Sequence, residues 1–221
     1  MKNAANLLNI LFPENCVCQI CGKECADVSD GLCAACKIDL IPCAALPAHP
    51  PLSACAAGLM YTDTARSAIH QFKYSDAVYL ASLLTSYMHI PPAWIFDVIV
   101  PVPLHPIRKF MRGYNQSERL ASALKRRCAA LARIPISPEL LKRTRYTPSQ
   151  TTKTSLERRE NIADAFRASA AVKGKSILLI DDVITTGATL SACAEALHRS
   201  GALRVYAICA AAAERHVQDS L

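Results

Sequence analysis

Residues 177–189, ILLIDDVITTGAT, place an apolar run directly before two acidic residues and a small hydroxylated loop. The run at 177–180 has the apolar and β-branched composition of a buried strand. After the loop, apolar or small side chains recur at helical spacing, which predicts a helix over about 190–200 that ends before Gly201. The stretch therefore predicts a strand, a loop and a helix N-terminus in succession.

A helix N-terminus that follows such a loop is suited to bind an anion. Its first backbone N–H groups have no partner within the helix and lie at the positive end of the helix dipole. Thr185, Thr186 and Thr189 add hydroxyl donors, and Gly187 allows the backbone to approach a phosphate closely. The loop is thus a candidate phosphate site.

The paired carboxylates of Asp181 and Asp182 would repel a phosphate that they faced directly. We expect them instead to accept hydrogen bonds from sugar hydroxyls, or to meet Mg²⁺ through water. A phosphate, a diol and a metal ion together suggest a phosphorylated ribose as the ligand.

All thirteen residues resemble the phosphoribosyl-pyrophosphate-binding signature of type I phosphoribosyltransferases. The resemblance implies an α/β fold, with a Rossmann-like parallel sheet flanked by helices, and binding of phosphoribosyl pyrophosphate with Mg²⁺. It implies that Asp181 and Asp182 hold the ribose. It also implies that the loop holds the 5′-phosphate through Thr185, Thr186, Gly187, Ala188 and Thr189. Enzymes that salvage 6-oxopurines usually carry an aspartate at the position of Thr185, so this residue argues against that substrate.

The composition, 52% hydrophobic and 19% charged over 221 residues, is that of a globular protein. No apolar run approaches the roughly 20 residues that cross a bilayer. Asn3, Asn6, Asn9 and Pro13 interrupt the start of the chain where a signal peptide would need an apolar run. We expect a cytoplasmic protein without membrane insertion.

Seven of the eleven cysteines lie in residues 1–46, and four of them form two Cys-x-x-Cys pairs, Cys18 with Cys21 and Cys33 with Cys36. Because the cytosol keeps thiols reduced, such pairs indicate metal ligation rather than disulfides. Two pairs predict a structural zinc site with four thiolate ligands, in a small zinc-ribbon-like module that folds around the metal. Cys16 or Cys25 could replace one of the four ligands.

A second strand is predicted at residues 96–103, whose nearly continuous apolar content is typical of a buried parallel strand. Residues 104–116 after it are rich in cations and turn formers and are predicted to form a loop, followed by a helix over about 117–131. In a doubly wound sheet this loop lies at the carboxyl ends of the strands, where ligands bind. We therefore expect it to face Asp181.

The segment PVPLHPIRKFMRGYNQ, residues 101–116, resembles the ComF family when read with the cysteine pairs upstream and the acidic loop downstream. This family includes competence proteins of naturally transformable bacteria. The resemblance implies that Pro103, Leu104 and His105 present backbone groups to the diphosphate. It also implies that Arg108 and Arg112 supply positive charge to the leaving group.

Residues 135–168 combine a polar, Thr-rich stretch with basic residues, a composition typical of a mobile flap. The resemblance implies a loop that closes over the substrate, with the family's pattern matched at Arg143, Gln150, Arg159 and Asn161. Arg143 would then be a third catalytic cation. The alternative is a basic, solvated loop without a catalytic part.

We predict a zinc module at 1–46 and a phosphoribosyltransferase-like domain at 47–221, divided into a hood at 47–95 and a core at 96–214. Two helices are predicted within the hood, at 63–74 and about 76–88. The first carries His70, Lys73 and Tyr74, which could line a ligand site, although a solvated helix face is the more common meaning of such residues.

Residues 105–160 carry 14 Lys and Arg against four Glu, whereas the whole chain has a net charge of +7. Such a basic region binds an acidic partner, either a diphosphate or a nucleic acid. Together with the resemblance, three functions stay open: a transferase for an unknown nucleobase acceptor, a protein that binds single-stranded DNA and keeps a regulatory or vestigial ribose-diphosphate site, or a zinc-dependent docking partner of a DNA-uptake helicase. In the second, Tyr114 or Tyr146 would stack on bases.

Overall fold

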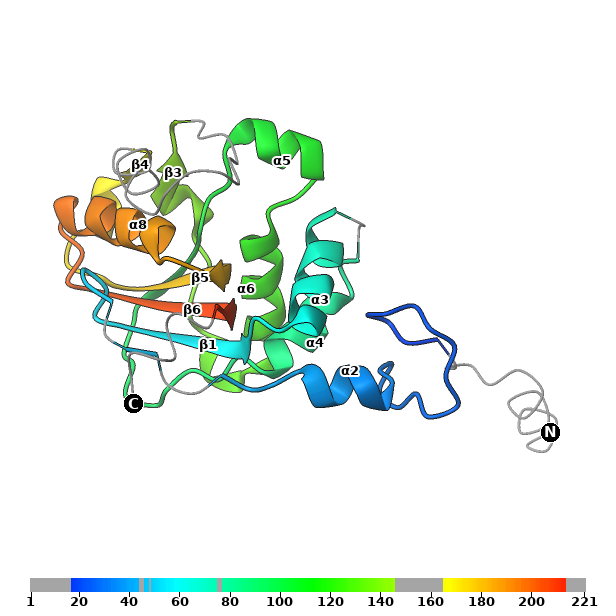
Figure 1. The fold of residues 1–221 in the computed structure, drawn as a ribbon. Coiled ribbons are helices and arrows are strands. Elements are labelled where there is room, and N and C mark those ends of the chain that lie inside the picture. The colour runs from blue at the N-terminus through cyan, green and yellow to red at the C-terminus, as the bar shows by residue number, and fades with distance from the viewer. Residues whose placement is uncertain (1–16, 44–45, 48, 75–76, 146–164, 214–221) are drawn as a thin grey trace, which may run out of the picture.

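A computed structural model describes residues 17–43, 46–47, 49–74, 77–145 and 165–213. Its main sheet has four parallel strands in the order β1-β6-β5-β2 (Figure 1). The strands are β1 (Ala54–Met60), β2 (Val98–Pro101), β5 (Ser176–Ile184) and β6 (Arg204–Ala212). The two strands predicted from apolar runs, at 96–103 and 177–180, are thus confirmed as the neighbours β2 and β5.

β5 is longer than its apolar run, because its neighbour β6 continues far enough to pair with it. Asp181 lies opposite Cys209, and Ile184 lies opposite Ala212. Asp181 and Asp182 are therefore inside the strand rather than after its end. This extension fixes the backbone that carries both carboxylates.

Helices cover both faces of the sheet, which explains why its strands are mostly apolar. α3 (Asp63–Tyr74), α4 (Leu80–Ser86) and α6 (Gln116–Arg127) pack on the face that presents Leu178 and Ile180. α8 (Ala188–Arg199) packs on the face that presents Ile177 and Leu179. No helix of the described residues is long and apolar enough to cross a membrane.

The connections from β2 and β5 leave the sheet on opposite sides, since α6 follows β2 and α8 follows β5. In open α/β sheets this change of side opens a crevice at the carboxyl ends of the two strands. The register places Pro101 opposite Ile180, and the Val102 N–H donates to the Ile180 carbonyl at 2.9 Å. The chain that follows β2 therefore starts beside the position of Asp181 in β5.

The cationic segment after β2 is not the loop that was predicted, because most of it forms α5 (Pro106–Arg112). His105 caps this helix by accepting the Ile107 N–H at Nδ1, 3.3 Å away. Pro106 suits the first turn, and Gly113 ends the helix with φ of 76°. No residue of α5 is buried, so the helix projects from the fold (Figure 1).

The predicted helix at 117–131 ends early as α6, because Cys128 leaves helical geometry and a 3-10 turn follows at Ala129–Leu131. Two further 3-10 turns lie at Pro138–Leu140 and Ala170–Val172. β3 (Leu141–Arg143) and β4 (Phe166–Ala168) form an antiparallel pair that joins the two ends of the predicted flap. Residues 146–164 of that flap, with Tyr146, Gln150, Arg159 and Asn161, lie outside the described residues.

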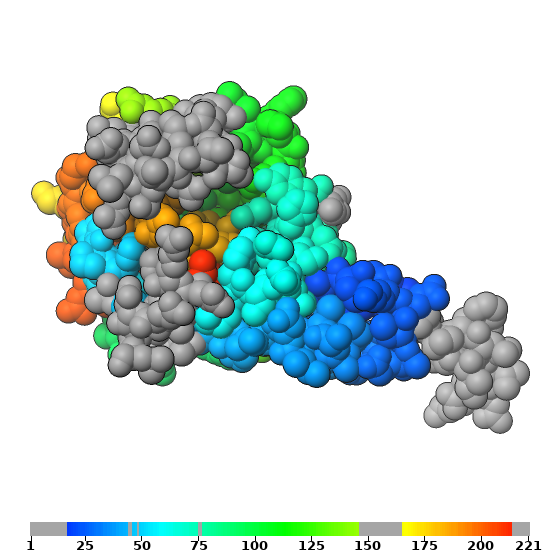
Figure 2. Space-filling view, in the orientation of Figure 1, coloured from blue at the N-terminus to red at the C-terminus, as the bar shows by residue number. Residues whose placement is uncertain are grey.

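The N-terminal module extends from one side of the sheet domain (Figures 1 and 2) and contains α2 (Ala34–Asp39). Its apolar residues Ile20 and Leu40 belong to the same core as Ile69 of α3. The Gln71 amide also donates to the Ile20 carbonyl at 2.5 Å. The module is thus packed directly against α3.

Candidate functional site

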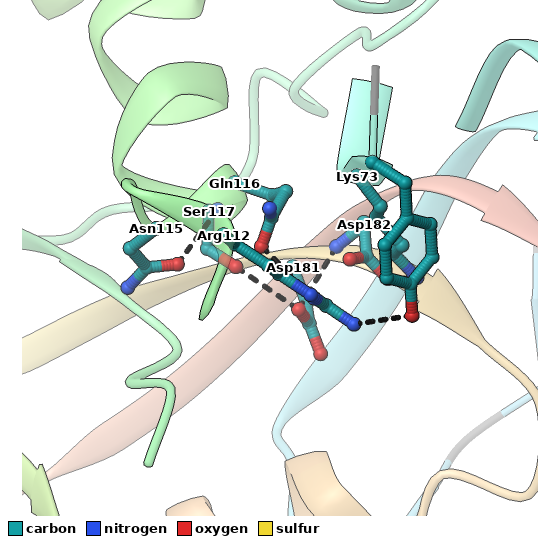
Figure 3. Close-up of polar contacts among 8 residues, drawn as sticks. Lys73, Arg112, Asn115, Gln116, Ser117, Asp181 and Asp182 are labelled. Atoms are coloured by element: carbon teal, nitrogen blue, oxygen red, sulfur yellow. Dashed lines mark hydrogen bonds and ion pairs between the residues drawn. The ribbon is translucent and has the colours of Figure 1, made fainter. Parts of the chain in front are cut away.

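The two carboxylates of β5 are held by side chains from different helices (Figure 3). Asp181 Oδ1 accepts from Ser117 Oγ at 3.0 Å and from the Asp182 backbone N–H at 2.9 Å. Asp182 Oδ1 accepts from the Lys73 ammonium at 2.9 Å, and the two side chains of this pair are only 14% and 21% exposed. α3, α6 and β5 therefore converge on the acidic pair.

The surroundings change the proton affinities of these groups. Burial, followed by the nearby Asp182, raises the pKa of Asp181 to about 7, although Lys73 and the Ser117 hydroxyl act in the opposite direction. Burial alone would lower the pKa of Lys73, but the charges of Asp182 and Asp181 outweigh it and the pKa is raised. Asp181 is thus poised to exchange a proton near neutral pH, while Lys73 stays charged.

Arg112 lies on the Lys73 side of the acidic pair. Its guanidinium donates to the Tyr74 hydroxyl at 2.7 Å and to Gln116 Oε1 at 3.1 Å. It also lies 4.7 Å from the centre of the Tyr74 ring, within the range of a cation–π contact. These contacts hold one of the predicted cations close to the carboxylates.

The other two predicted cations, Arg108 and Arg143, form a separate group. Burial and then the charge of Arg108 lower the pKa of Arg143. Arg143 also lies 5.4 Å from the Phe166 ring. A cavity of about 390 Å³ is lined by Arg143 together with Pro103 and Leu104 of the predicted diphosphate loop. The structure therefore brings Arg143 to this loop, but it places Arg112 in a different group.

The predicted phosphate loop spans Thr185 to Gly187 and leads into α8 at Ala188. Gly187 is the N-cap residue, with φ of 69°, and the Ala188 N–H donates to Thr186 Oγ1 at 3.4 Å. The His49 imidazole lies directly over Gly187, because a Cβ atom added there would be 1.7 Å from His49 Nε2. The segment before β1 therefore reaches the predicted phosphate loop, a contact that the sequence did not indicate.

Residues 111–220 match the family model of the phosphoribosyl transferase domain. The chain is 30% identical over 211 residues to the DNA utilization protein YhgH of Escherichia coli K12, across 87% of this chain and 88% of that protein. It is 34% identical over 108 residues to competence protein F of Haemophilus influenzae, across 48% and 45% of the two chains. The chain belongs to the ComF family. It is also similar to competence protein ComFC of Bacillus subtilis, with 32% identity over 146 residues, 64% of this chain and 56% of that one.

Two solved structures also align with this ComF chain. The allosteric regulatory enzyme of purine biosynthesis is 20% identical with a TM-score of 0.37, and the match covers 64% of this chain but only 26% of that one. A hypoxanthine phosphoribosyltransferase from Trypanosoma cruzi is 14% identical with a TM-score of 0.30, over 65% and 64% of the two chains. The parallel sheet covered on both faces and the domain match establish a type I phosphoribosyltransferase-like fold for the ComF chain.

The sequence did not assign Lys73, Ser117 or Gln116 to the ComF site. The interpretation of 70–74 as a solvated helix face is wrong for Lys73, which is bonded to Asp182, although Tyr74 is 60% exposed. Lys73 and Asp182 are 109 residues apart, so no local pattern could pair them. Gln116 and Ser117 are the first two residues of α6, and Asn115 is its N-cap. The predicted helix start at residue 117 is one residue later than the observed start.

The four predicted zinc ligands of the ComF module lie together. The sulfur atoms of Cys18, Cys21, Cys33 and Cys36 are all within 4.8 Å of one another, and the Cys21 and Cys33 sulfurs are 3.9 Å apart. Tetrahedral zinc with Zn–S bonds of about 2.3 Å requires sulfur separations of about 3.8 Å, so the cluster fits zinc. Cys25 is not in this group of four, and Cys16 lies outside the described residues.

The Cys18 thiol has the proton affinity expected of a metal ligand. Burial would raise its pKa, but hydrogen bonds from backbone N–H groups of Cys21, Cys33 and Ile20 outweigh burial and lower the pKa to about 6. Thiolates rather than thiols bind zinc. The fold of the Cys18–Cys21 turn therefore favours the thiolate of Cys18, whereas burial and hydrogen bonds with Cys18 and Cys33 raise the pKa of Cys36.

Proposed function

We propose that this ComF protein binds phosphoribosyl pyrophosphate with Mg²⁺ and serves DNA uptake. The observation that carries the proposal is the acidic pair: two carboxylates, bonded to Ser117 and Lys73, lie in β5, and Asp182 stands five residues before Gly187, the N-cap of α8. A ribose diol suits the carboxylates, and a 5′-phosphate suits the first turn of α8. The role in DNA uptake is inferred from relatives whose names refer to competence and DNA utilization.

The carboxylate oxygens fit Mg²⁺, which prefers oxygen ligands and keeps several waters. Asp181 and Asp182 would hold the ion together with the ribose and diphosphate oxygens, and the ion would neutralise charge on the diphosphate. Thr185, Thr186, Ala188 and Thr189 would hold the 5′-phosphate, and Gly187 would allow its close approach. Backbone groups of 103–105 would face the diphosphate.

The arginines would neutralise the diphosphate from two sides, Arg112 beside Lys73 and Arg108 with Arg143 beside the 103–105 loop. If catalysis follows binding, this charge would stabilise a leaving diphosphate while the carboxylates hold the ribose. Gln150, Arg159 and Asn161 remain predicted flap residues. The acceptor is not a 6-oxopurine if Thr185 has the meaning that the family pattern gives it.

A thermal-shift series tests the ligand class. We expect phosphoribosyl pyrophosphate to raise the melting temperature in the presence of Mg²⁺, ribose 5-phosphate to raise it less, and a magnesium-free sample to respond weakly. A response to ribose 5-phosphate equal to that of phosphoribosyl pyrophosphate would contradict a diphosphate subsite. A panel of nucleobases, with pyrophosphate release as the readout, then separates a transferase from a binding protein.

A second candidate function is binding of single-stranded DNA, and one surface favours it. Phe110 on α5 is 90% exposed and stands between Lys109 and Met111, with Arg108 two residues before it and Arg112 two residues after it. An exposed aromatic ring among cations can stack on a base while the cations contact phosphates. Tyr114 suits this task less well, because its hydroxyl donates to the Phe72 carbonyl and its ring packs 6.0 Å from the Phe72 ring.

The DNA candidate is tested by salt-dependent binding of a short oligonucleotide. Affinity should fall with a log–log slope of roughly −0.7 for each phosphate contact. Phe110→Leu keeps an apolar side chain but removes the ring, so it should weaken binding by roughly tenfold. Leu203→Ala alters another exposed apolar residue, 67% exposed before β6, and should have no effect. Equal affinities of the two variants would remove α5 from the DNA site.

A further inference from the structure

Gln116 is the first residue of α6 and is only 1% exposed. Its Oε1 accepts a hydrogen bond from Arg112 at 3.1 Å. Its Nε2 is buried, and within the part of the chain that the structure describes it has no hydrogen-bond partner. A buried donor without an acceptor destabilises a fold unless another molecule supplies the acceptor.

The neighbouring polar side chains are satisfied, so the orphan nitrogen is specific to Gln116. Asn115 accepts the Ser117 N–H at 3.0 Å and donates to the Val102 carbonyl at 3.1 Å. Ser117 donates to Asp181 at 3.0 Å. The start of α6 is thus a well-bonded segment in which one amide nitrogen is left over.

Arg112 fixes the direction in which this nitrogen points. The guanidinium can only donate hydrogen bonds, so the amide must turn its oxygen toward Arg112 and its nitrogen away. Arg112 is itself anchored by the Tyr74 hydroxyl at 2.7 Å and by the Tyr74 ring. Figure 3 shows Gln116, Arg112 and Lys73 gathered around the acidic pair.

Three side chains around the acidic pair can donate hydrogen bonds to a ligand. Lys73 carries an ammonium, Arg112 a guanidinium, and Gln116 an amide N–H, and they come from α3, α5 and α6. A ligand that satisfies all of them must be rich in acceptors and negative in charge, as a diphosphate is. A sugar hydroxyl matches the acidic pair better, because it can donate to a carboxylate.

We propose that Gln116 donates a hydrogen bond to a diphosphate oxygen of the bound ligand and is a binding residue of a subsite formed with Lys73 and Arg112. This proposal rests on the proposed function. It adds residues on the α3 and α6 side of the crevice to the predicted loop at 103–105 as contacts of the diphosphate. It makes Gln116 a residue that distinguishes phosphoribosyl pyrophosphate from ribose 5-phosphate, which lacks the diphosphate.

Two substitutions of the full chain separate this role from a purely structural one. Gln116→Met removes both hydrogen-bonding atoms at similar length. Gln116→Glu keeps an acceptor for Arg112 but replaces the donor with a second oxygen. If Gln116 only holds Arg112, Gln116→Glu should bind as the wild type does. If the residue at 116 matters only through its charge, the Gln116→Met variant should bind phosphoribosyl pyrophosphate as tightly as the wild type does.

Calorimetry with Mg²⁺ and either ligand gives the result. We expect both variants to bind phosphoribosyl pyrophosphate about tenfold or more weakly, and to bind ribose 5-phosphate with less than about twofold change. Wild-type affinity for phosphoribosyl pyrophosphate in either variant, or an equal loss of affinity for both ligands, overturns this inference but not the proposed function. A wild-type protein that binds neither ligand overturns the proposed function and the inference with it. Gln116→Glu retains the Arg112 contact, so it keeps the test open if Gln116→Met does not fold.

Discussion

The ammonium of Lys73 and the carboxylate of Asp182 lie 2.9 Å apart, although 109 residues separate them in the chain. This pair joins the end of α3 to the central strand β5. It partly neutralises the acidic pair without a ligand, and it explains how β5 can carry two adjacent carboxylates at the bottom of a crevice. Lys73 is therefore both a support of the fold and a cation at the candidate site.

Lys73→Met should reduce the free energy of unfolding, because it leaves a mostly buried carboxylate without its partner. Hydrogen bonds to charged groups are worth about 1.5–3 kcal/mol, and urea unfolding measures the change. The control is Arg66→Met on the same helix, whose pair with Asp63 is exposed and worth at most about 1 kcal/mol. The double variant Lys73→Met, Asp182→Asn should recover part of the loss. Additive losses would show that the pair does not couple.

The affinity for Mg²⁺ and phosphoribosyl pyrophosphate should fall as the pH is lowered through 7. The raised pKa of Asp181, about 7, means that the folded protein holds this proton at a pH where an ordinary carboxyl has lost it. Protonation favours the folded state as pH falls, but it opposes a metal ion that needs the carboxylate. Below about pH 7 the affinity should drop by at most tenfold per pH unit.

Asp181→Asn provides the control for this pH dependence, because the amide does not titrate while the ligand's own ionisation is unchanged. Calorimetry of both proteins between about pH 6 and pH 8 should give a steeper fall for the wild type. Parallel profiles would show that Asp181 does not titrate in this range.

Gly187→Ala should weaken binding of the 5′-phosphate and destabilise the fold. The residue has φ of 69°, and a Cβ atom would lie 1.7 Å from His49 Nε2. Gly174→Ala is the matched control, since Gly174 has φ of 75° but nothing lies within 4 Å of an added Cβ. The control should cost about 1–2 kcal/mol for the backbone conformation alone, and Gly187→Ala should cost more. Equal losses in urea unfolding would mean that His49 moves away freely.

The purified protein should contain one zinc per chain when chelators are avoided, because four thiolates form a closed structural site. Cys18→Ser or Cys36→Ser should release the metal and lower the melting temperature. Cys25 and Cys193 lie outside the group of four, so the Cys25→Ser and Cys193→Ser variants should keep the zinc ion. Metal analysis of the four variants decides the ligand set. Loss of zinc from the Cys25→Ser variant would mean that Cys25 is a ligand in place of one of the proposed four.

Much of the fold was accessible from the sequence because its signals are local. Apolar runs predicted β2 and β5, and periodicity with a leading acidic residue predicted α3 over its observed range, Asp63–Tyr74. The spacing of the cysteine pairs predicted a cluster that the fold brings together. The acidic motif located β5 and the start of α8, although β5 extends past both aspartates through its pairing with β6.

The remaining features depend on contacts between distant segments. α5 forms because His105 and Gly113 cap a stretch whose composition resembles a loop. The contacts of Lys73 with Asp182 and of His49 with Gly187 join elements that only the folded sheet brings together. The orphan nitrogen of Gln116 is visible only when every neighbouring hydrogen bond has been assigned.

The most direct test of the central claim is a calorimetric titration of the wild type and of the Asp181→Asn, Asp182→Asn variant with phosphoribosyl pyrophosphate and Mg²⁺. The variant keeps the size and shape of both side chains but removes the charges that would hold the metal ion and accept from the ribose. We predict saturable binding to the wild type and a loss of at least about a hundredfold in the variant, as expected when two charge-assisted interactions are removed. Unchanged affinity in the variant would place the ligand away from β5 and contradict the account.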